Sequence, residues 1–168
     1  MRIVVLSFDL PQHTFETVNS ALALIKPEDI ILVHNGSSQK NVLRLKKKLP
    51  TIQHLVLHKN YHFSGGANRG LSYAFEQSDW VLFLTNDCQI EELGTIPNQP
   101  GIYAPQIFQL KNQKVDSIGG TIDPVNFVLR HAKSPAEFIG SHLRYVPGTA
   151  FWIDKTSYQE LSGFDESF

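Results

Sequence analysis

Asn86 and Asp87 are the residues of this sequence best suited to metal and phosphate chemistry, because they directly follow an apolar run. The run spans residues 81–84, and four consecutive apolar residues before a polar stop predict a strand buried on both faces. In open α/β sheets, ligands bind in the crevice outside the carboxyl ends of such strands. Carboxylate and amide oxygens there suit Mg²⁺ or Mn²⁺ and, through the metal, phosphates. The alternative is an Asx turn that only ends the strand.

A second group with binding chemistry is Gly65 and Gly66, followed by Asn68 and Arg69. Apolar residues between positions 67 and 75 share one helical face, so the sequence predicts a glycine-rich loop leading into a helix N-terminus. Such an end suits an anion such as a phosphate. Arg69, in the first turn, could reach a diphosphate or pair with a loop carboxylate. The segment lacks the Lys-Ser/Thr of a P-loop and the dinucleotide spacing.

Three strand–helix pairs lead up to the run at residues 81–84. Short apolar segments predict strands at residues 3–6, 30–33 and 52–57, the last near a sheet edge. Between them we predict one helix capped by Thr14 and ended by Pro27, and a second over residues 39–49. This alternation indicates parallel strands with right-handed crossovers. The loops at residues 7–9, 34–37 and 85–87 should therefore converge on one sheet edge.

After Asp87 the pattern becomes irregular, and the sequence predicts a smaller, partly antiparallel region. We expect a helical turn at residues 91–93, a short strand at 102–104, and a hairpin turn at 111–113. Further strands are expected over residues 115–122 and 125–130, and 131–142 should be a loop. A strand over residues 145–153, broken at Pro147-Gly148, and a helix over 156–161 complete the chain.

Composition excludes several classes of protein. The 168 residues are 42% hydrophobic and 18% charged, which indicates one folded domain rather than a disordered chain. A net charge of −1 argues against broad affinity for nucleic acid. One cysteine, Cys88, excludes an internal disulfide and leaves the cytoplasm as the expected compartment. The seven histidines are scattered and lack the spacing of zinc ligands. Lys46, Lys47 and Lys48 lie in the last turn of a predicted helix, where their positive charges complement the negative end of the helix dipole.

Several motifs occur together in order along almost the whole chain. They are Ser7-Phe8-Asp9, Asn35-Gly36-Ser37, Asn60 followed by Gly65-Gly66-Ala67-Asn68-Arg69-Gly70, Asn86-Asp87, Pro147-Gly148-Thr149-Ala150-Phe151-Trp152-Ile153, and Gly163-Phe164-Asp165-Glu166. With these motifs the sequence resembles the family 2 glycosyltransferases, and most of all their bacterial branch that contains rhamnosyltransferases. The resemblance implies a GT-A, Rossmann-like three-layer sandwich with a mostly parallel central sheet and a smaller mixed or antiparallel C-terminal part. Residues 1–168 would be one domain, with a nucleotide-binding half at 1–90 and a partial sugar and acceptor half at 91–168.

The resemblance also implies ligands and site residues. The donor would be a UDP-, dTDP- or GDP-linked sugar, bound with Mg²⁺ or Mn²⁺ at Asp87. Gly148 and Thr149 would line the donor sugar and acceptor. The nucleotide would contact a further set of residues: Ser7, Asp9, Asn35, Ser37, Gly66, Asn68, Arg69 and Asn86.

The sequence departs from the family pattern at three places. His34 stands where the family often has an aspartate that touches the base, and residues 85–87 offer one carboxylate instead of an acidic pair. The chain stops at Phe168, so we expect the Glu-Asp motif that supplies the family's catalytic base to be absent. Asp165 or Glu166 would then be the candidate base.

The leading interpretation is an inverting glycosyltransferase acting on a saccharide or lipid-linked acceptor, in cell-surface polysaccharide synthesis. It would work in the cytoplasm or peripherally at the inner face of the membrane, and a protein partner or second copy could complete the acceptor site. The alternative is a truncated, non-catalytic module that binds nucleotide sugar or another protein. A nucleotidyltransferase would want a glycine-rich basic segment after the first strand, where this chain has Ser7-Phe8-Asp9.

Overall fold

A six-stranded sheet forms the centre of the molecule. The computed structural model describes residues 1–140 and 143–167. The strand order is β3-β2-β1-β4-β11-β5, and the first four strands are mutually parallel while β11 runs antiparallel to β4 and β5. The bounds are β1 Arg2–Ser7, β2 Ile30–Asn35, β3 Gln53–Leu57, β4 Trp80–Thr85, β5 Ile102–Tyr103 and β11 Ala150–Asp154.

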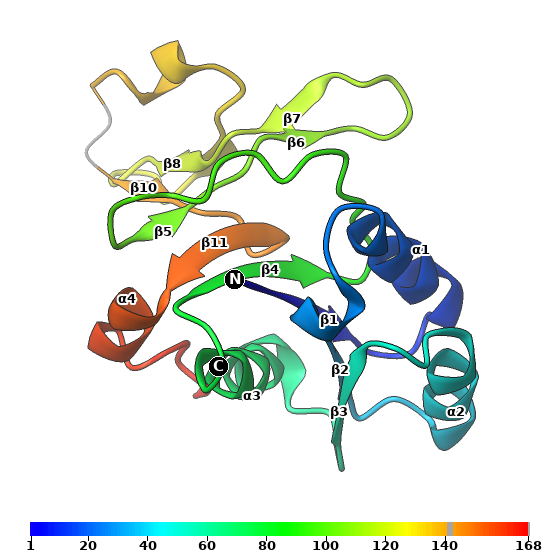
Figure 1. Cartoon of the computed structure of the whole chain (residues 1–168). Coiled ribbons are helices and arrows are strands. Elements are labelled where there is room, and N and C mark those ends of the chain that lie inside the picture. The colour runs from blue at the N-terminus through cyan, green and yellow to red at the C-terminus, as the bar shows by residue number, and fades with distance from the viewer. Residues whose placement is uncertain (141–142, 168) are drawn as a thin grey trace.

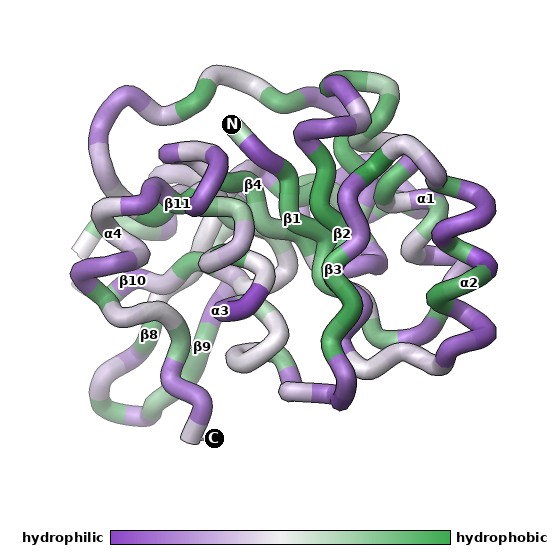
Figure 2. Tube along the Cα trace, turned by 60° about the horizontal axis from the view of Figure 1, so that its bottom comes forward, coloured by the Kyte–Doolittle hydropathy of each residue, from purple (hydrophilic) through white to green (hydrophobic). Residues whose placement is uncertain are grey.

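Helices cover both faces of this sheet and make three layers (Figure 1). The helices α1 (Pro11–Leu22) and α2 (Gln39–Lys48) pack on one face, and α3 (His62–Phe75) and α4 (Lys155–Glu160) on the other. Two 3₁₀ helices are η1 (Pro27–Asp29) and η2 (Pro135–Phe138). Figure 2 shows hydrophobic residues following one another along β1 and β2, as expected of strands buried on both faces.

A smaller antiparallel region follows β4 and lies beside β5 and β11 (Figure 1). It contains the hairpin of β6 (Ile107–Phe108) with β7 (Val115–Ser117). A three-stranded sheet pairs β8 (Gly120–Ile122) with both β9 (Leu129–His131) and β10 (Arg144–Tyr145). The fold class, the four parallel strands, the edge position of β3 and the turn at residues 111–113 are therefore confirmed.

The glycines of α3 correct one prediction. Gly65 and Gly66 lie inside the helix, not in a loop before it. A Cβ on Gly66 would come 2.6 Å from Asn35 Nδ2, and one on Gly70 would come within 3 Å of Val4 and Val33. These glycines let the helix approach β1 and β2 closely, so the sequence signal came from packing rather than from an anion-binding loop.

Other predicted bounds also need correction. Thr14 lies within α1 and does not cap it, because the helix begins at Pro11. Residues 115–122 form two strands, and the strand predicted at 125–130 is confined to β9. Residues 91–93 are not helical, and the predicted loop at 131–142 contains η2. Residues 141–142, and the chain end at Phe168 from which the missing base motif is inferred, lie outside the described residues.

Candidate functional site

The three loops predicted to converge do meet at the carboxyl edge of the parallel strands. The backbone N–H of Asp9, after β1, donates to Ser37 Oγ, after β2, at 2.9 Å. The amide of Asn86, after β4, donates to Thr14 Oγ1 at 2.9 Å. Thr14 in turn shares a 2.8 Å hydrogen bond with Ser7 Oγ. This network fixes the loops against α1.

The loop after β1 is held in an unusual backbone conformation. Asp9 and Leu10 both have positive φ, at 52° and 48°, which is uncommon for residues other than glycine. One carboxylate oxygen of Asp9 accepts hydrogen bonds from Asn41 Nδ2 and from the backbone and hydroxyl of Ser38, at 2.8 to 3.0 Å. The hydrogen bond from Asn41, followed by that from the Ser38 backbone, lowers the pKa of Asp9. The result is a locked loop that presents the ring of Phe8, half exposed, at the sheet edge.

Ser7, Asp9 and Ser37, predicted to contact a nucleotide, lie in this network. The side chain of Ser7 is fully buried, and Ser37 Oγ faces the backbone of Asp9. All three are placed to hold the loops, and direct contact with a nucleotide stays a prediction.

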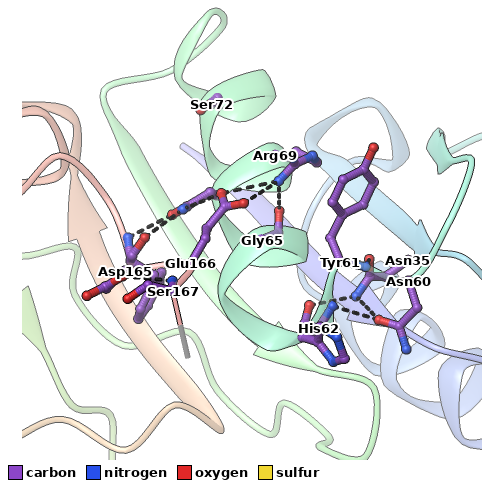
Figure 3. Close-up of polar contacts among 12 residues, drawn as sticks. Asn35, Asn60, Tyr61, His62, Gly65, Arg69, Ser72, Asp165, Glu166 and Ser167 are labelled. Atoms are coloured by element: carbon purple, nitrogen blue, oxygen red, sulfur yellow. Dashed lines mark hydrogen bonds and ion pairs between the residues drawn. The ribbon is translucent and has the colours of Figure 1, made fainter.

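Asn35, at the end of β2, organises the start of α3. Its Nδ2 donates to Asn60 Oδ1 at 3.1 Å and to the carbonyl of His62 at 2.8 Å. Its Oδ1 accepts from the backbone N–H of Tyr61 at 2.9 Å. Asn35 thus joins the end of β2 to the residues that begin α3 (Figure 3), and Gly66 packs directly against its amide.

Asp87 is exposed, directly after the exit of β4. Its Oδ1 accepts a 2.5 Å hydrogen bond from the hydroxyl of Thr85, while Oδ2 has no hydrogen-bond partner among the described residues. An exposed carboxylate oxygen is a suitable ligand for Mg²⁺ or Mn²⁺. Within residues 1–140 and 143–167, no three His, Cys, Asp or Glu side chains gather into a metal site. Protein ligation would therefore rest on one carboxylate, with diphosphate oxygens and water supplying the rest.

Two cavities lie near this edge, and Phe63 lines the smaller of them. The first, of about 210 Å³, is lined by Leu6, Phe8, Asn35, Asn60, His62, Phe63, Thr85 and Asn86. The second, of about 550 Å³, is mostly apolar, and its lining includes Gly148, Phe151, Phe164 and Arg144. The ring of Phe63 contacts Phe164 edge to face and lies about 3.0 Å from where a Cβ on Gly148 would be. Phe63 therefore lines the smaller cavity and contacts two residues that line the larger one.

Gly148 and Thr149, predicted to line the sugar, lie next to Asp87. The backbone N–H of Thr85 donates to the carbonyl of Thr149 at 2.9 Å, and the Thr85 hydroxyl contacts the same carbonyl. Cys88 adjoins this point, and burial raises the pKa of its thiol. The start of β11 therefore lies beside Asp87, whose carboxylate follows the end of β4.

A family model described as glycosyl transferase family 2 matches residues 3–99, more than half of the chain. The chain belongs to glycosyl transferase family 2. No curated protein sequence gives a match. The matched segment contains Phe8, Asn35, Asn60 and Asp87, whereas Gly148, Thr149 and Phe164 lie outside it.

Two solved glycosyltransferases share the fold. The mannosyltransferase PcManGT from Pyrobaculum calidifontis, solved with GDP-Man and Mn²⁺, aligns with a TM-score of 0.62 at 11% identity, over 99% of this chain and 47% of its own. S. aureus TarS 1–349 aligns with a TM-score of 0.51 at 14% identity, over 99% of this chain and 51% of its own. The chain spans about half the length of these structures. At these identities the likeness confirms the GT-A fold alone.

In this family 2 chain, Glu166 of the predicted catalytic pair contacts α3 (Figure 3). Glu166 accepts hydrogen bonds from Asn68 Nδ2 at 2.9 Å and pairs with Arg69 Nη1 at 3.1 Å. These contacts, that of Asn68 first, lower the pKa of Glu166. The hydrogen bonds from Ser167 lower the pKa of Asp165. Asn68 and Arg69, predicted to lie beside the nucleotide, thus hold the segment at residues 164–166.

Sequence reasoning assigned no role to four residues of the smaller cavity: Phe8, Asn60, His62 and Phe63. Phe8 and Asn60 lie within the motifs that carried the family resemblance, so their position offered a signal. His62 and Phe63 gave none, because their roles depend on a backbone conformation and on contacts with residues far along the chain.

None of the described helices is long and apolar enough to cross a membrane.

Proposed function

We propose that this domain binds a nucleoside-diphosphate sugar with Mg²⁺ or Mn²⁺ and transfers the sugar, with inversion, to a saccharide or lipid-linked acceptor. The observation that carries the proposal is the exposed carboxylate of Asp87 beside a cavity walled by the loops after β1, β2 and β4. Polysaccharide synthesis at the cytoplasmic side of the membrane is the process that suits this reaction.

The strand order supports one orientation for the donor. From β2 through β1 and β4 to β11, the edge presents first Asn35, then Phe8, then Asp87, and last Thr149. A diphosphate at Asp87 therefore places the base toward β1 and β2, in the smaller cavity. The sugar then points toward Gly148 and the larger cavity, which we assign to the sugar and acceptor.

The chain's own residues would act on the leaving group. A divalent cation supplies charge neutralisation on the diphosphate as it departs. Asp87 would bind that cation with one carboxylate oxygen, while Thr85 holds the carboxylate in place by its 2.5 Å hydrogen bond. Phe63 and Phe164 would exclude water from the sugar side, where hydrolysis competes with transfer.

Deprotonation of the acceptor hydroxyl would fall to Asp165 or Glu166. Both carboxyls have lowered pKa values, and a lower pKa weakens a general base. Glu166 is also held by Asn68 and Arg69. This arrangement favours, as a second candidate, a module that binds nucleotide sugar and needs a base from a partner or a second copy.

The test is calorimetric titration of the chain with UDP, dTDP and GDP, with and without Mn²⁺. We expect metal-dependent binding of at least one, and no binding in any condition contradicts the proposal. Incubation with nucleotide sugars and candidate acceptors then separates the two candidates. General-base catalysis typically contributes about 10²–10⁴-fold, so without a competent base we expect slow donor hydrolysis rather than transfer. Transfer at about 1 s⁻¹ or faster would assign catalysis to the chain itself.

A further inference from the structure

The turn between β8 and β9 presents apolar side chains to solvent. Val125 is 81% exposed and Phe127 is 82% exposed, and Leu129, the first residue of β9, is 63% exposed. Figure 2 shows β8 and β9 at the edge of the molecule, away from β1 and β2. Exposed apolar side chains that gather at one place mark a surface that contacts a partner.

The backbone donors of this turn are already satisfied inside it. Asp123 Oδ1 accepts from the N–H of Val125 at 2.9 Å and from that of Asn126 at 3.1 Å. The N–H of Phe127 donates to the carbonyl of Asp123 at 2.8 Å, and Pro124 has no N–H. The turn can therefore leave water without losing hydrogen bonds to these donors, which is a condition for entering a lipid layer.

Two arginines lie beside the turn on one face of the small sheet. Arg130 of β9 and Arg144 of β10 are each in register with Thr121 of β8, which lies between them. Directly opposed residues of antiparallel strands share a face, so the two side chains lie on the same side. Arg144 also lies over the ring of Phe138. Among residues 1–140 and 143–167, neither arginine forms an ion pair.

The acidic groups of this region are engaged locally. Residues 119–145 contain two carboxylates against three arginine and lysine side chains, whereas the whole chain has a net charge of −1. The carboxylate of Asp123 belongs to the turn, and that of Glu137 accepts from the N–H of Lys133 and the hydroxyl of Ser134. The unpaired guanidinium groups beside the apolar turn therefore suit an anionic partner.

The size of the apolar surface favours lipid over protein. A stable protein interface takes about 800 Å² from each partner. Even an aromatic side chain buries only about 150–250 Å², so one turn is too small. Apolar side chains that enter the headgroup boundary beside basic side chains that bind anionic lipids are typical of peripheral membrane contact.

Resting on the proposed function, we propose that the turn between β8 and β9 docks on an anionic lipid bilayer. Val125 and Phe127 enter the headgroup region, and Arg130 and Arg144 bind lipid phosphates. Arg144 and Tyr145 of β10 also line the larger cavity, so this contact places that cavity beside the membrane. A lipid-linked acceptor then reaches the cavity directly from the bilayer.

Vesicle flotation of the full chain tests the docking. One set of vesicles is phosphatidylcholine alone, and the other is equal parts phosphatidylcholine and phosphatidylglycerol. We expect the chain to float with the anionic vesicles and to be released by high salt. No flotation with the anionic vesicles, or equal flotation with both sets, overturns the inference.

Two variants then locate the contact. Phe127→Ser should weaken vesicle binding about tenfold, because a large apolar side chain is lost from the headgroup region. Arg130→Gln should weaken it about fivefold. Leu110→Ser is the matched control, because Leu110 is 72% exposed in the hairpin between β6 and β7. We expect its binding and the thermal melting of all three variants to match wild type, and wild-type binding by Phe127→Ser contradicts the inference.

Other contacts are separated by the same assay. The exposed side of α2 carries Lys40, Arg44 and Lys47 without an acidic residue, so loss of binding in Lys47→Gln but not in Phe127→Ser would place the contact on α2. Sedimentation that shows self-association lost in Phe127→Ser, without vesicle binding, would assign the turn to a second copy. Either result overturns the inference.

A tryptophan at the turn reports insertion itself. Phe127→Trp should show a blue shift of its fluorescence when anionic vesicles are added, and Leu110→Trp should not. Equal shifts in the two variants contradict insertion at the turn. Failure of UDP, dTDP and GDP to bind would overturn the proposed function without changing vesicle binding, so the two failures are distinguishable.

Discussion

The guanidinium of Arg69 lies 3.1 Å from the carboxylate of Glu166 and 3.6 Å from the ring centroid of Tyr61. One side chain of α3 thereby joins the C-terminal segment to the residue that precedes the helix. The same guanidinium donates to the carbonyl of Gly65 at 2.8 Å. Arg69 thus already has three partners inside the chain, two of them bound through Nη1, and we infer that it supports the site indirectly.

Replacing Arg69 by alanine tests this inference. We expect nucleotide affinity to change less than twofold, and cleavage of the C-terminal segment by added protease to become faster. Calorimetry and a timed proteolysis assay measure the two effects. A direct hydrogen bond to a diphosphate would instead cost about 1.5–3 kcal/mol of binding free energy. A loss of that size would show that Arg69 binds the diphosphate directly.

Replacing Asp87 by alanine should abolish the part of nucleotide binding that depends on metal. The fold should persist, because the side chain is exposed and its one short hydrogen bond is to Thr85. Asp87→Asn is the matched control, because it keeps the size of the side chain and removes only its charge. We expect this variant to bind metal poorly as well. Titration with UDP at several Mn²⁺ concentrations checks this, and metal-dependent affinity equal to wild type in Asp87→Ala would exclude Asp87 as the ligand.

The pair of His34 and His54 should make stability depend on pH. Their rings stack, and His34 Nε2 lies 2.9 Å from His54 Nδ1. Burial, followed by the charges of His54 and Lys46, lowers the pKa of His34 from 6.5 to about 4. The unfolded chain then binds more protons between these values, so stability is complete above pH 6.5 and falls as the pH drops toward 4.

For one proton the limiting slope is about 1.4 kcal/mol per pH unit. Urea unfolding at pH 7.5, 6.0 and 5.0 measures it. His34→Gln should flatten this dependence, whatever its effect on stability at neutral pH, and His13→Gln, at an exposed position of α1, is the control. A slope that persists in His34→Gln would assign it to other groups.

Gly70→Ala should destabilise the fold although alanine is the better helix former. A Cβ would lie 2.8 Å from Val33 Cγ2 and 2.9 Å from Val4 Cγ1, both fully buried. Overpacking typically costs 1–3 kcal/mol, which exceeds the roughly 1 kcal/mol gained in helix propensity. We expect a net loss of about 1 kcal/mol in urea unfolding. Glu76→Ala, at the exposed end of α3, should be near neutral, and a Gly70→Ala protein as stable as wild type would refute close packing here.

The sequence predicted the parallel half of the fold well because its strands are buried on both faces. Residues 81–84 and 30–33 have no polar interruption, so their burial was visible without any contact information. The same reasoning failed at Gly65 and Gly66, which lie inside α3. Gly66 packs closely against β1 and β2, and in a sequence such a glycine looks like a loop glycine. It also failed at Thr14, whose hydroxyl faces Ser7 and Asn86 and does not cap a helix.

For the site, sequence motifs located the edge but not the roles within it. Asp87, Asn35 and Asn86 were predicted there and lie there. The hydrogen bonds of Asp9 could not be predicted, because its partners Ser38 and Asn41 lie at the start of α2, far along the chain. Nor could the positive φ of His62, 56°, because its backbone is held by two asparagines from separate segments.

β4 lies between β1 and β11, so the most apolar strand of the sheet receives its second partner from near the end of the chain. When only residues 1–99 have emerged from the ribosome, one edge of β4 is unpaired, and Phe151 is not yet present to stack on Phe83. Such edges template association with other chains. The nascent protein should therefore be prone to aggregation until residues 150–154 emerge, and a chaperone that shields this edge should raise the yield of folded chain.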